Sequence, residues 1–125
     1  MKITVIGFGY IGSVISATLS NKGHKVLAID KNKSLIDKLN EGECDIPEPF
    51  LKKMIYHSVK SGLLYGSTSY TNLKECEIIL VTVGTSLSTE FDADLSALKE
   101  VFENLSAYAL NGQTVMIKST IPPGV

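Results

Sequence analysis

The chain has 125 residues, of which 44% are hydrophobic and 20% charged, and its formal net charge at pH 7 is −1. A chain of this size and composition can bury one hydrophobic core and corresponds to a single domain. Its balanced charge, without a dense cluster of Lys and Arg, excludes the basic surface typical of proteins that bind nucleic acid or anionic lipid. No apolar run is long enough to span a membrane and no signal peptide precedes the first strand, so we expect a cytoplasmic protein without a membrane partner.

The first expected elements form a pattern that is typical of dinucleotide binding. An apolar strand, Ile3–Ile6, leads into GFGYIG, whose glycines Gly7, Gly9 and Gly12 have the G-x-G-x-x-G spacing. Gly7 allows a sharp turn, Gly9 allows the backbone to approach a pyrophosphate, and Gly12 allows the following helix to pack closely on the sheet. The free N–H groups at the start of that helix then favour the phosphate charges.

The second expected strand places an acid at its carboxyl end. After Gly23, a predicted helix stop, the strand Lys25–Ile29 delivers Asp30 to the edge of the sheet. Its carboxylate can accept hydrogen bonds from both hydroxyls of the adenosine ribose and would repel a 2′-phosphate. The pattern therefore indicates NAD in preference to NADP as the cofactor, although Lys31 and Lys33 nearby favour the opposite choice.

The rest of the chain alternates between helical and strand-like hydrophobic patterns, without repeats or linkers. Because helices separate strands joined by short connections, we expect a parallel sheet with right-handed crossovers. The predicted fold class is α/β, a three-layer, doubly wound sheet of the Rossmann type that stops before a sixth strand. Helices are expected around Leu35–Leu39 behind an Asn32 cap, over Phe50–Val59 and over Leu95–Ala109, and strands over Leu63–Ser67, Glu77–Val83 and Thr114–Lys118.

In a doubly wound sheet the ligand lies at the carboxyl ends of the strands, where the strand order reverses. That rule selects the loops at 7–12, 83–92 and 119–125, together with Asp30. Thr85 and Thr120 each follow a strand in these loops. A threonine there either donates its hydroxyl to a ribose or phosphate oxygen or caps a turn, and the residues alone leave both roles open.

The cysteines and histidines give no sign of a metal site. Cys44 and Cys76 lie far apart in the sequence and neither has a second cysteine nearby, so neither zinc binding nor a redox pair is encoded. Both are interpreted as structural or exposed thiols. His24 and His57 have no partner at metal-ligand spacing and are expected at the surface or at helix ends.

Four motifs, in order, resemble the signatures of the UDP-glucose/GDP-mannose dehydrogenase family, and the resemblance covers essentially the whole chain. It implies the N-terminal NAD-binding domain, residues 1–125, of a nucleotide-sugar 6-dehydrogenase. Such an enzyme oxidises the C6 alcohol of a UDP- or GDP-linked sugar, with UDP-glucose or a UDP-N-acetylhexosamine favoured here, to a carboxylate with two NAD+, for polysaccharide biosynthesis. The motifs are GFGYIG, Asn40-Glu41-Gly42 with Pro47-Glu48-Pro49, Val83-Gly84-Thr85 with Asp92-Ala93-Asp94-Leu95-Ser96, and Ser119-Thr120-Ile121-Pro122-Pro123-Gly124.

The resemblance also implies roles for single residues. Ser86 departs from the family pattern, which commonly has proline there, and Leu35 stands where many members carry a basic residue near the ribose. Lys31 and Lys33 are the candidates to replace that basic contact. Thr120 matches a threonine that contacts cofactor and helps to order the catalytic water. The cofactor-binding residues implied are Gly7, Gly9, Tyr10, Ile11, Gly12, Asp30, Lys31, Val83, Gly84, Thr85 and Thr120.

The family's catalytic cysteine has no match in this chain. Neither Cys44 nor Cys76 lies on the expected cofactor loops, so no catalytic nucleophile is predicted. We therefore expect a fragment of a longer enzyme that lacks the central helix and the sugar-binding domain. Alone it should bind NAD weakly or not at all and catalyse nothing, whereas the full-length enzyme should form a homodimer.

Two other functions share the opening pattern. A non-enzymatic NAD-sensing module would need Gly7 to Asp30 but has no reason to carry the later dehydrogenase motifs. A Rossmann dehydrogenase acting on a hydroxy acid or a phosphosugar acid would explain the same opening segment. It would not explain Pro47-Glu48-Pro49 or the segment from Asp92 to Ser96.

Overall fold

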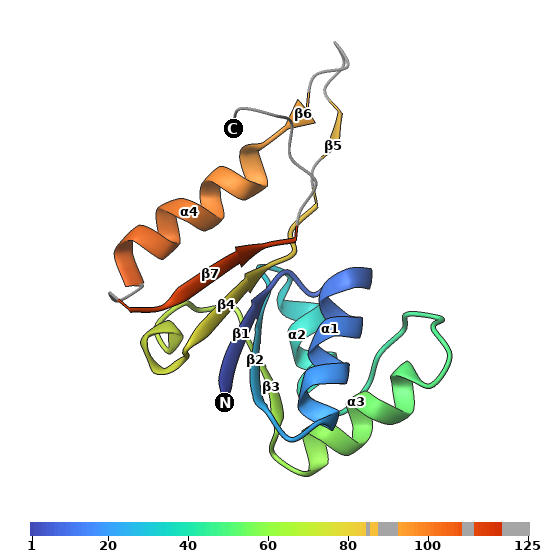
Figure 1. Cartoon of the computed structure of the whole chain (residues 1–125). Helices are drawn as coiled ribbons and strands as arrows, with labels where there is room; N and C mark the ends of the chain where they lie inside the picture. Colours follow the sequence, from blue (N-terminus) through green and yellow to red (C-terminus); the bar gives the residue numbers. More distant parts are fainter. Residues whose placement is uncertain (85, 88–92, 109–111, 119–125) are drawn as a thin grey trace.

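The computed structural model describes residues 1–84, 86–87, 93–108 and 112–118. Its centre is a five-stranded sheet in which every pair of neighbours is parallel, and the strand order is β3-β2-β1-β4-β7 (Figure 1). All five predicted strands of this sheet are confirmed. Their bounds are Lys2–Ile6 for β1, Lys25–Ile29 for β2, Leu64–Ser67 for β3, Ile78–Val81 for β4 and Thr114–Ile117 for β7.

The strand order reverses between β1 and β4. From β1 the chain builds outwards through β2 and β3, and it then returns to place β4 on the other side of β1. The register pairs Ile6 with Ile29 of β2 and with Val81 of β4, so these three strands end at the same edge of the sheet. This edge, beside the reversal, is where a doubly wound sheet binds its ligand.

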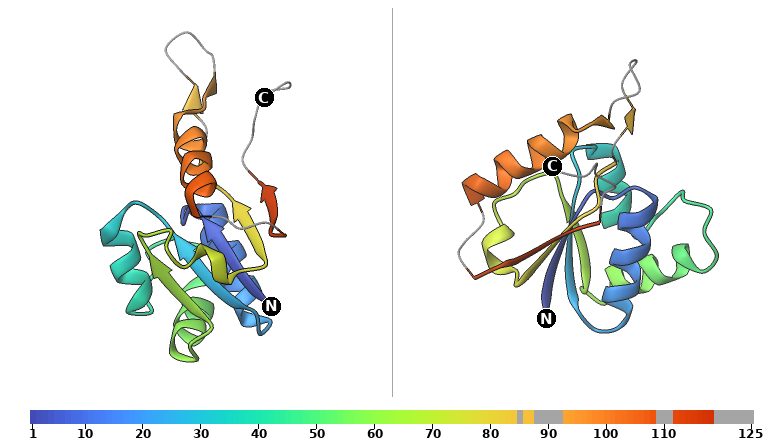
Figure 2. Two further views of the ribbon diagram at one scale, coloured as in Figure 1. Left: turned by 90° about the vertical axis from the view of Figure 1, so that its left-hand side faces the viewer. Right: turned by 45° about the horizontal axis from the view of Figure 1, so that its top comes forward.

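Helices cover both faces of the sheet, which confirms the predicted three-layer architecture (Figures 1 and 2). One face packs against α1 (Tyr10–Asn21), α2 (Lys33–Asn40) and α3 (Leu51–Lys60) around a buried apolar cluster. The other packs against α4 (Ser96–Tyr108) and the short 3-10 helix η1 (Leu73–Glu75) around a second cluster. Burial of apolar side chains on both faces explains the continuous apolar runs of the central strands.

The local signals at the helix ends behave as their chemistry predicts. The Asn32 side chain caps α2 by accepting a hydrogen bond from the Leu35 N–H at 3.2 Å. After α1 the chain turns through Gly23, whose φ of 99° lies in the region that favours glycine. These two residues fix where β2 begins and where α2 begins, and so they set the position of Asp30.

Three features differ from expectation or add to it. A short antiparallel pair, β5 (Ser86–Leu87) with β6 (Ala93–Asp94), was not predicted, because two-residue strands carry no hydrophobic period. The 3-10 helix η1 lies between β3 and β4, where no helix was predicted. All four residues of β7, one of the two edge strands of the sheet, are exposed. Among the described residues, no helix is long and apolar enough to cross a membrane.

Candidate dinucleotide-binding site

The turn after β1 is held by hydrogen bonds from the two neighbouring strands. Gly7 adopts a φ of 98°, and its N–H donates to the carbonyl oxygen of Ile29 at 2.7 Å. Thr82 directly follows β4. Its hydroxyl donates to the carbonyl oxygens of Ile6 and Gly7, at distances of 3.1 Å and 2.9 Å. These hydrogen bonds hold the glycine loop in place.

Gly9 and Gly12 have different surroundings, and each fits its predicted role. A Cβ atom at Gly12 would lie 1.8 Å from the Gly7 carbonyl oxygen and 2.7 Å from Thr82 Oγ1, so only glycine allows this close approach. A Cβ at Gly9 would meet nothing within 4 Å. Gly9 is the N-cap of α1 and makes no side-chain cap bond, so the first turn of the helix offers free N–H groups beside open space. This arrangement fits a pyrophosphate.

Asp30 joins the end of β2 to the glycine loop. Its Oδ2 accepts a hydrogen bond from the Phe8 N–H at 2.8 Å, and its Oδ1 accepts one from the Asn32 N–H at 2.9 Å. Phe8 itself is only 1% exposed, so the loop is anchored in the core on its other side. Each carboxylate oxygen can accept a further hydrogen bond, which leaves Asp30 able to receive ribose hydroxyls as predicted.

A cleft of about 430 Å³ opens at this edge of the sheet. Its volume falls in the range of small-molecule and cofactor sites. Six predicted cofactor residues line it: Gly7, Gly9, Asp30, Lys31, Val83 and Gly84. The other lining residues are Ile6, Ile29, Thr68, Tyr70, Thr82, Ala97, Glu100, Val101 and Asn104.

The remaining predicted residues lie elsewhere or outside the described part of the chain. Gly12 is buried beneath the loop, whereas Tyr10 and Ile11 are exposed on α1 and do not line the cleft. The Tyr10 hydroxyl donates a hydrogen bond to the Glu48 carboxylate, and this bond raises the pKa of Tyr10. Thr85 and Thr120 lie outside the described residues, so their predicted roles stay predictions.

The side wall of the cleft was not predicted, because no motif marks it. Tyr70 follows β3, while Glu100 and Asn104 come from α4. The Tyr70 ring stacks on that of Tyr108, with centroids 6.4 Å apart and an interplanar angle of 18°. Burial, followed by the negative charges of Glu100 and Asp30, raises the pKa of Tyr70. The one signal available was that Glu100 and Asn104 are four residues apart and so share a helix face.

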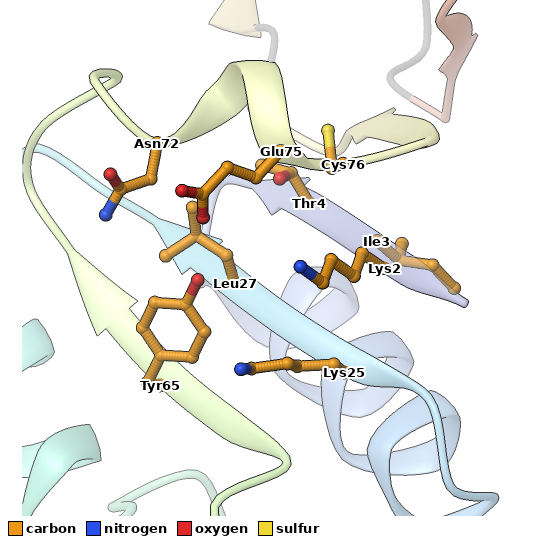
Figure 3. Close-up of a pocket in the computed structure, with 9 residues that line it drawn as sticks. All are labelled: Lys2, Ile3, Thr4, Lys25, Leu27, Tyr65, Asn72, Glu75 and Cys76. Atoms are coloured by element: carbon orange, nitrogen blue, oxygen red, sulfur yellow. The ribbon is translucent and has the colours of Figure 1, made fainter.

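A second, much smaller hollow lies near the start of β1 and β2 (Figure 3). Lys2, Lys25, Tyr65 and Glu75 are among its lining residues, but its volume of about 20 Å³ suits roughly one water molecule. The Cys76 thiol at its edge donates to the Leu73 carbonyl oxygen at 3.0 Å, and burial raises the pKa of this thiol.

Cys44 and Cys76 are both buried and free, in agreement with a structural role. No group of metal-binding side chains occurs among the described residues.

A parallel sheet with a reversal point, a glycine loop and an acid after the second strand defines a dinucleotide-binding domain. The family model for the NAD binding domain of the UDP-glucose/GDP-mannose dehydrogenase family matches residues 1–125, and the chain belongs to this family. Its cofactor is accordingly NAD.

Similar proteins are dehydrogenases of nucleotide sugars. The chain is 36% identical over 124 residues to a putative UDP-glucose 6-dehydrogenase, YtcA, of Bacillus subtilis, and 34% identical over 129 residues to GDP-mannose 6-dehydrogenase of Azotobacter vinelandii. A structure of UDP-D-ManNAc dehydrogenase from Pyrococcus horikoshii superposes with a TM-score of 0.94 at 32% identity. Each match covers 99% of this chain but only 28% or 29% of the similar protein, so the chain spans less than a third of their length.

Proposed function

We propose that this chain is the cofactor-binding domain of a longer enzyme that oxidises the C6 alcohol of a UDP- or GDP-linked sugar to a uronic acid. The observation that carries the proposal is the family match over residues 1–125, together with a cleft built from the residues that the family pattern marks. UDP-glucose and a UDP-N-acetylhexosamine are the favoured substrates. The relatives named above act, by name, on UDP-glucose, GDP-mannose and a UDP-linked N-acetylmannosamine.

The proposed reaction removes four electrons from one carbon. The alcohol, one water molecule and two NAD+ give a carboxylate, two NADH and three protons. When bound, NAD+ supplies the hydride acceptor in both steps. Because the two oxidations need two cofactor molecules in succession, the cleft must release NADH and rebind NAD+ within one turnover.

The residues of this chain contribute binding and orientation to that reaction. We assign the pyrophosphate to the free N–H groups beside Gly9, since this is the open part of the helix start. We assign the adenosine ribose to Asp30, which the Phe8 and Asn32 N–H groups hold in place. We propose that the sugar site, a catalytic nucleophile and the dimer interface of a homodimer belong to other parts of the enzyme.

The test is a turnover screen of the protein that carries this domain at its full length. NADH absorbance is followed with UDP-glucose, UDP-N-acetyl sugars and GDP-mannose as separate substrates. We expect one of them to yield two NADH for each sugar consumed. A yield of one NADH per substrate, or turnover only with hydroxy acids, would refute the proposed reaction. The 125-residue chain alone should produce no NADH with any of these sugars.

A further inference from the structure

Three charged side chains line the described part of the cofactor cleft, and they come from two different elements. Asp30 and Lys31 follow β2, whereas Glu100 lies on α4. The ammonium of Lys31 is 3.9 Å from Oε2 of Glu100, and both side chains are largely exposed. The ion pair therefore links the end of β2 to α4 beside the proposed ribose position.

A second observation places both acids around one side chain. The Tyr70 phenol is half-buried in the same cleft, and the charges of Glu100 and of Asp30 both raise its pKa, after the larger effect of burial. Both carboxylates therefore act on one small region of the cleft wall. Two acids and one lysine leave the charged lining with a net negative charge.

We propose that Glu100 is a second cofactor-selecting residue that works beside Asp30. It holds Lys31 in an ion pair and adds a negative charge, so that a 2′-phosphate on the adenosine ribose meets two carboxylates and no free lysine. The proposal rests on the assignment of this cleft to NAD.

The two lysines that follow Asp30 have different partners in the structure. Lys33 pairs with Asp37 on α2 at a distance of 2.8 Å and does not line the cleft. Lys31 does line the cleft. Its partner Glu100 lies on α4, which covers the other face of the sheet from α2. Of the two candidates for a basic ribose contact, only Lys31 is placed to serve, and Glu100 competes for it.

The test compares the affinities of 5′-AMP and adenosine 2′,5′-bisphosphate for the 125-residue chain. Binding is measured from amide chemical shifts in NMR titrations at low ionic strength. These probes occupy only the adenosine half of the site, whose proposed walls lie within the described residues. In Glu100→Gln we expect binding of the bisphosphate to strengthen about tenfold relative to 5′-AMP, from Coulomb's law for a unit charge near a dianion in a water-like medium. Added salt should reduce this gain, because the charges are exposed.

Two further variants separate this explanation from a general change of charge. Glu100→Gln combined with Lys31→Ala should lose most of the gain, because the freed lysine is then missing. Asp37→Asn, which removes an acid of the same charge and frees Lys33 outside the cleft, should leave the ratio of the two affinities unchanged. An unchanged ratio in Glu100→Gln, or an equal rise in Asp37→Asn, would overturn the proposal. Failure of 5′-AMP to shift the Gly7, Gly9 and Asp30 amides in the native chain would instead refute the cofactor cleft itself.

Discussion

Alanine substitutions at Gly12 and at Gly9 should both weaken cofactor binding, but only the substitution at Gly12 should lower stability. In Gly12→Ala the new methyl group would lie 1.8 Å from the Gly7 carbonyl oxygen, so the loop or the helix must move by more than about 1 Å to reach ordinary contact. Because the obstacle is backbone rather than a flexible side chain, we expect a cost of about 3 kcal/mol, the upper part of the overpacking range. For a domain of this size that cost lowers the Tm by about 12 °C. Gly9→Ala should leave the Tm unchanged, because nothing lies within 4 Å of its new methyl group.

The assay is thermal unfolding followed by circular dichroism, paired with an NMR titration of each variant with NAD+. Gly12→Ala should lose both stability and cofactor binding. Gly9→Ala should keep its native fold but lose binding, because its methyl group occupies the space assigned to the pyrophosphate. A Gly12→Ala variant that melts within about 2 °C of the native chain would refute the close approach between α1 and the loop.

Two other predictions concern hydrogen bonds around the loop. Thr82→Val removes the hydroxyl that donates to the Ile6 and Gly7 carbonyl oxygens and should cost about 1–2 kcal/mol in urea unfolding, whereas Thr82→Ser should retain most of that stability. A Thr82→Val variant as stable as the native chain, or a larger loss in Thr82→Ser than in Thr82→Val, would contradict the role of the hydroxyl. The Glu48 carboxylate raises the pKa of Tyr10 and so stabilises the neutral phenol. This contribution is complete below the unfolded pKa and is lost as pH rises through the folded value. In Glu48→Gln the Tyr10 ring signal in NMR should titrate at lower pH, and an unchanged titration would contradict the contact.

The parts of the fold that were predictable from the sequence depend on local chemistry. Gly7 and Gly23 adopt the positive φ angles for which glycine is suited, and the Asn32 side chain caps its own helix. The mainly apolar strands β1 and β4 are buried on both faces of the sheet, as their composition indicated. Each of these signals acts within a few residues, so it can be read without knowledge of the tertiary structure.

The parts that were missed depend on residues distant in sequence. Tyr70 and Glu100 reach the cleft only because the fold brings the end of β3 and helix α4 to the carboxyl ends of the strands. No spacing in the sequence connects these two residues with Asp30. Thr82 lies one residue beyond β4, and its hydroxyl is directed to the Gly7 carbonyl oxygen, 75 positions earlier. An isolated threonine in an apolar run carries no sign of such a contact.

The most direct test of the central claim, that the cleft at the glycine loop holds NAD, is a map of amide chemical shifts during titration of the native chain with NAD+. Because other parts of the proposed enzyme are expected to complete the site, we expect weak binding at millimolar cofactor. The largest shifts should occur at Gly7, Gly9, Asp30 and Val83, which line the cleft. Shifts that cluster around Lys2 and Lys25 at the opposite end of the strands, or binding that leaves the glycine loop unshifted, would contradict the claim.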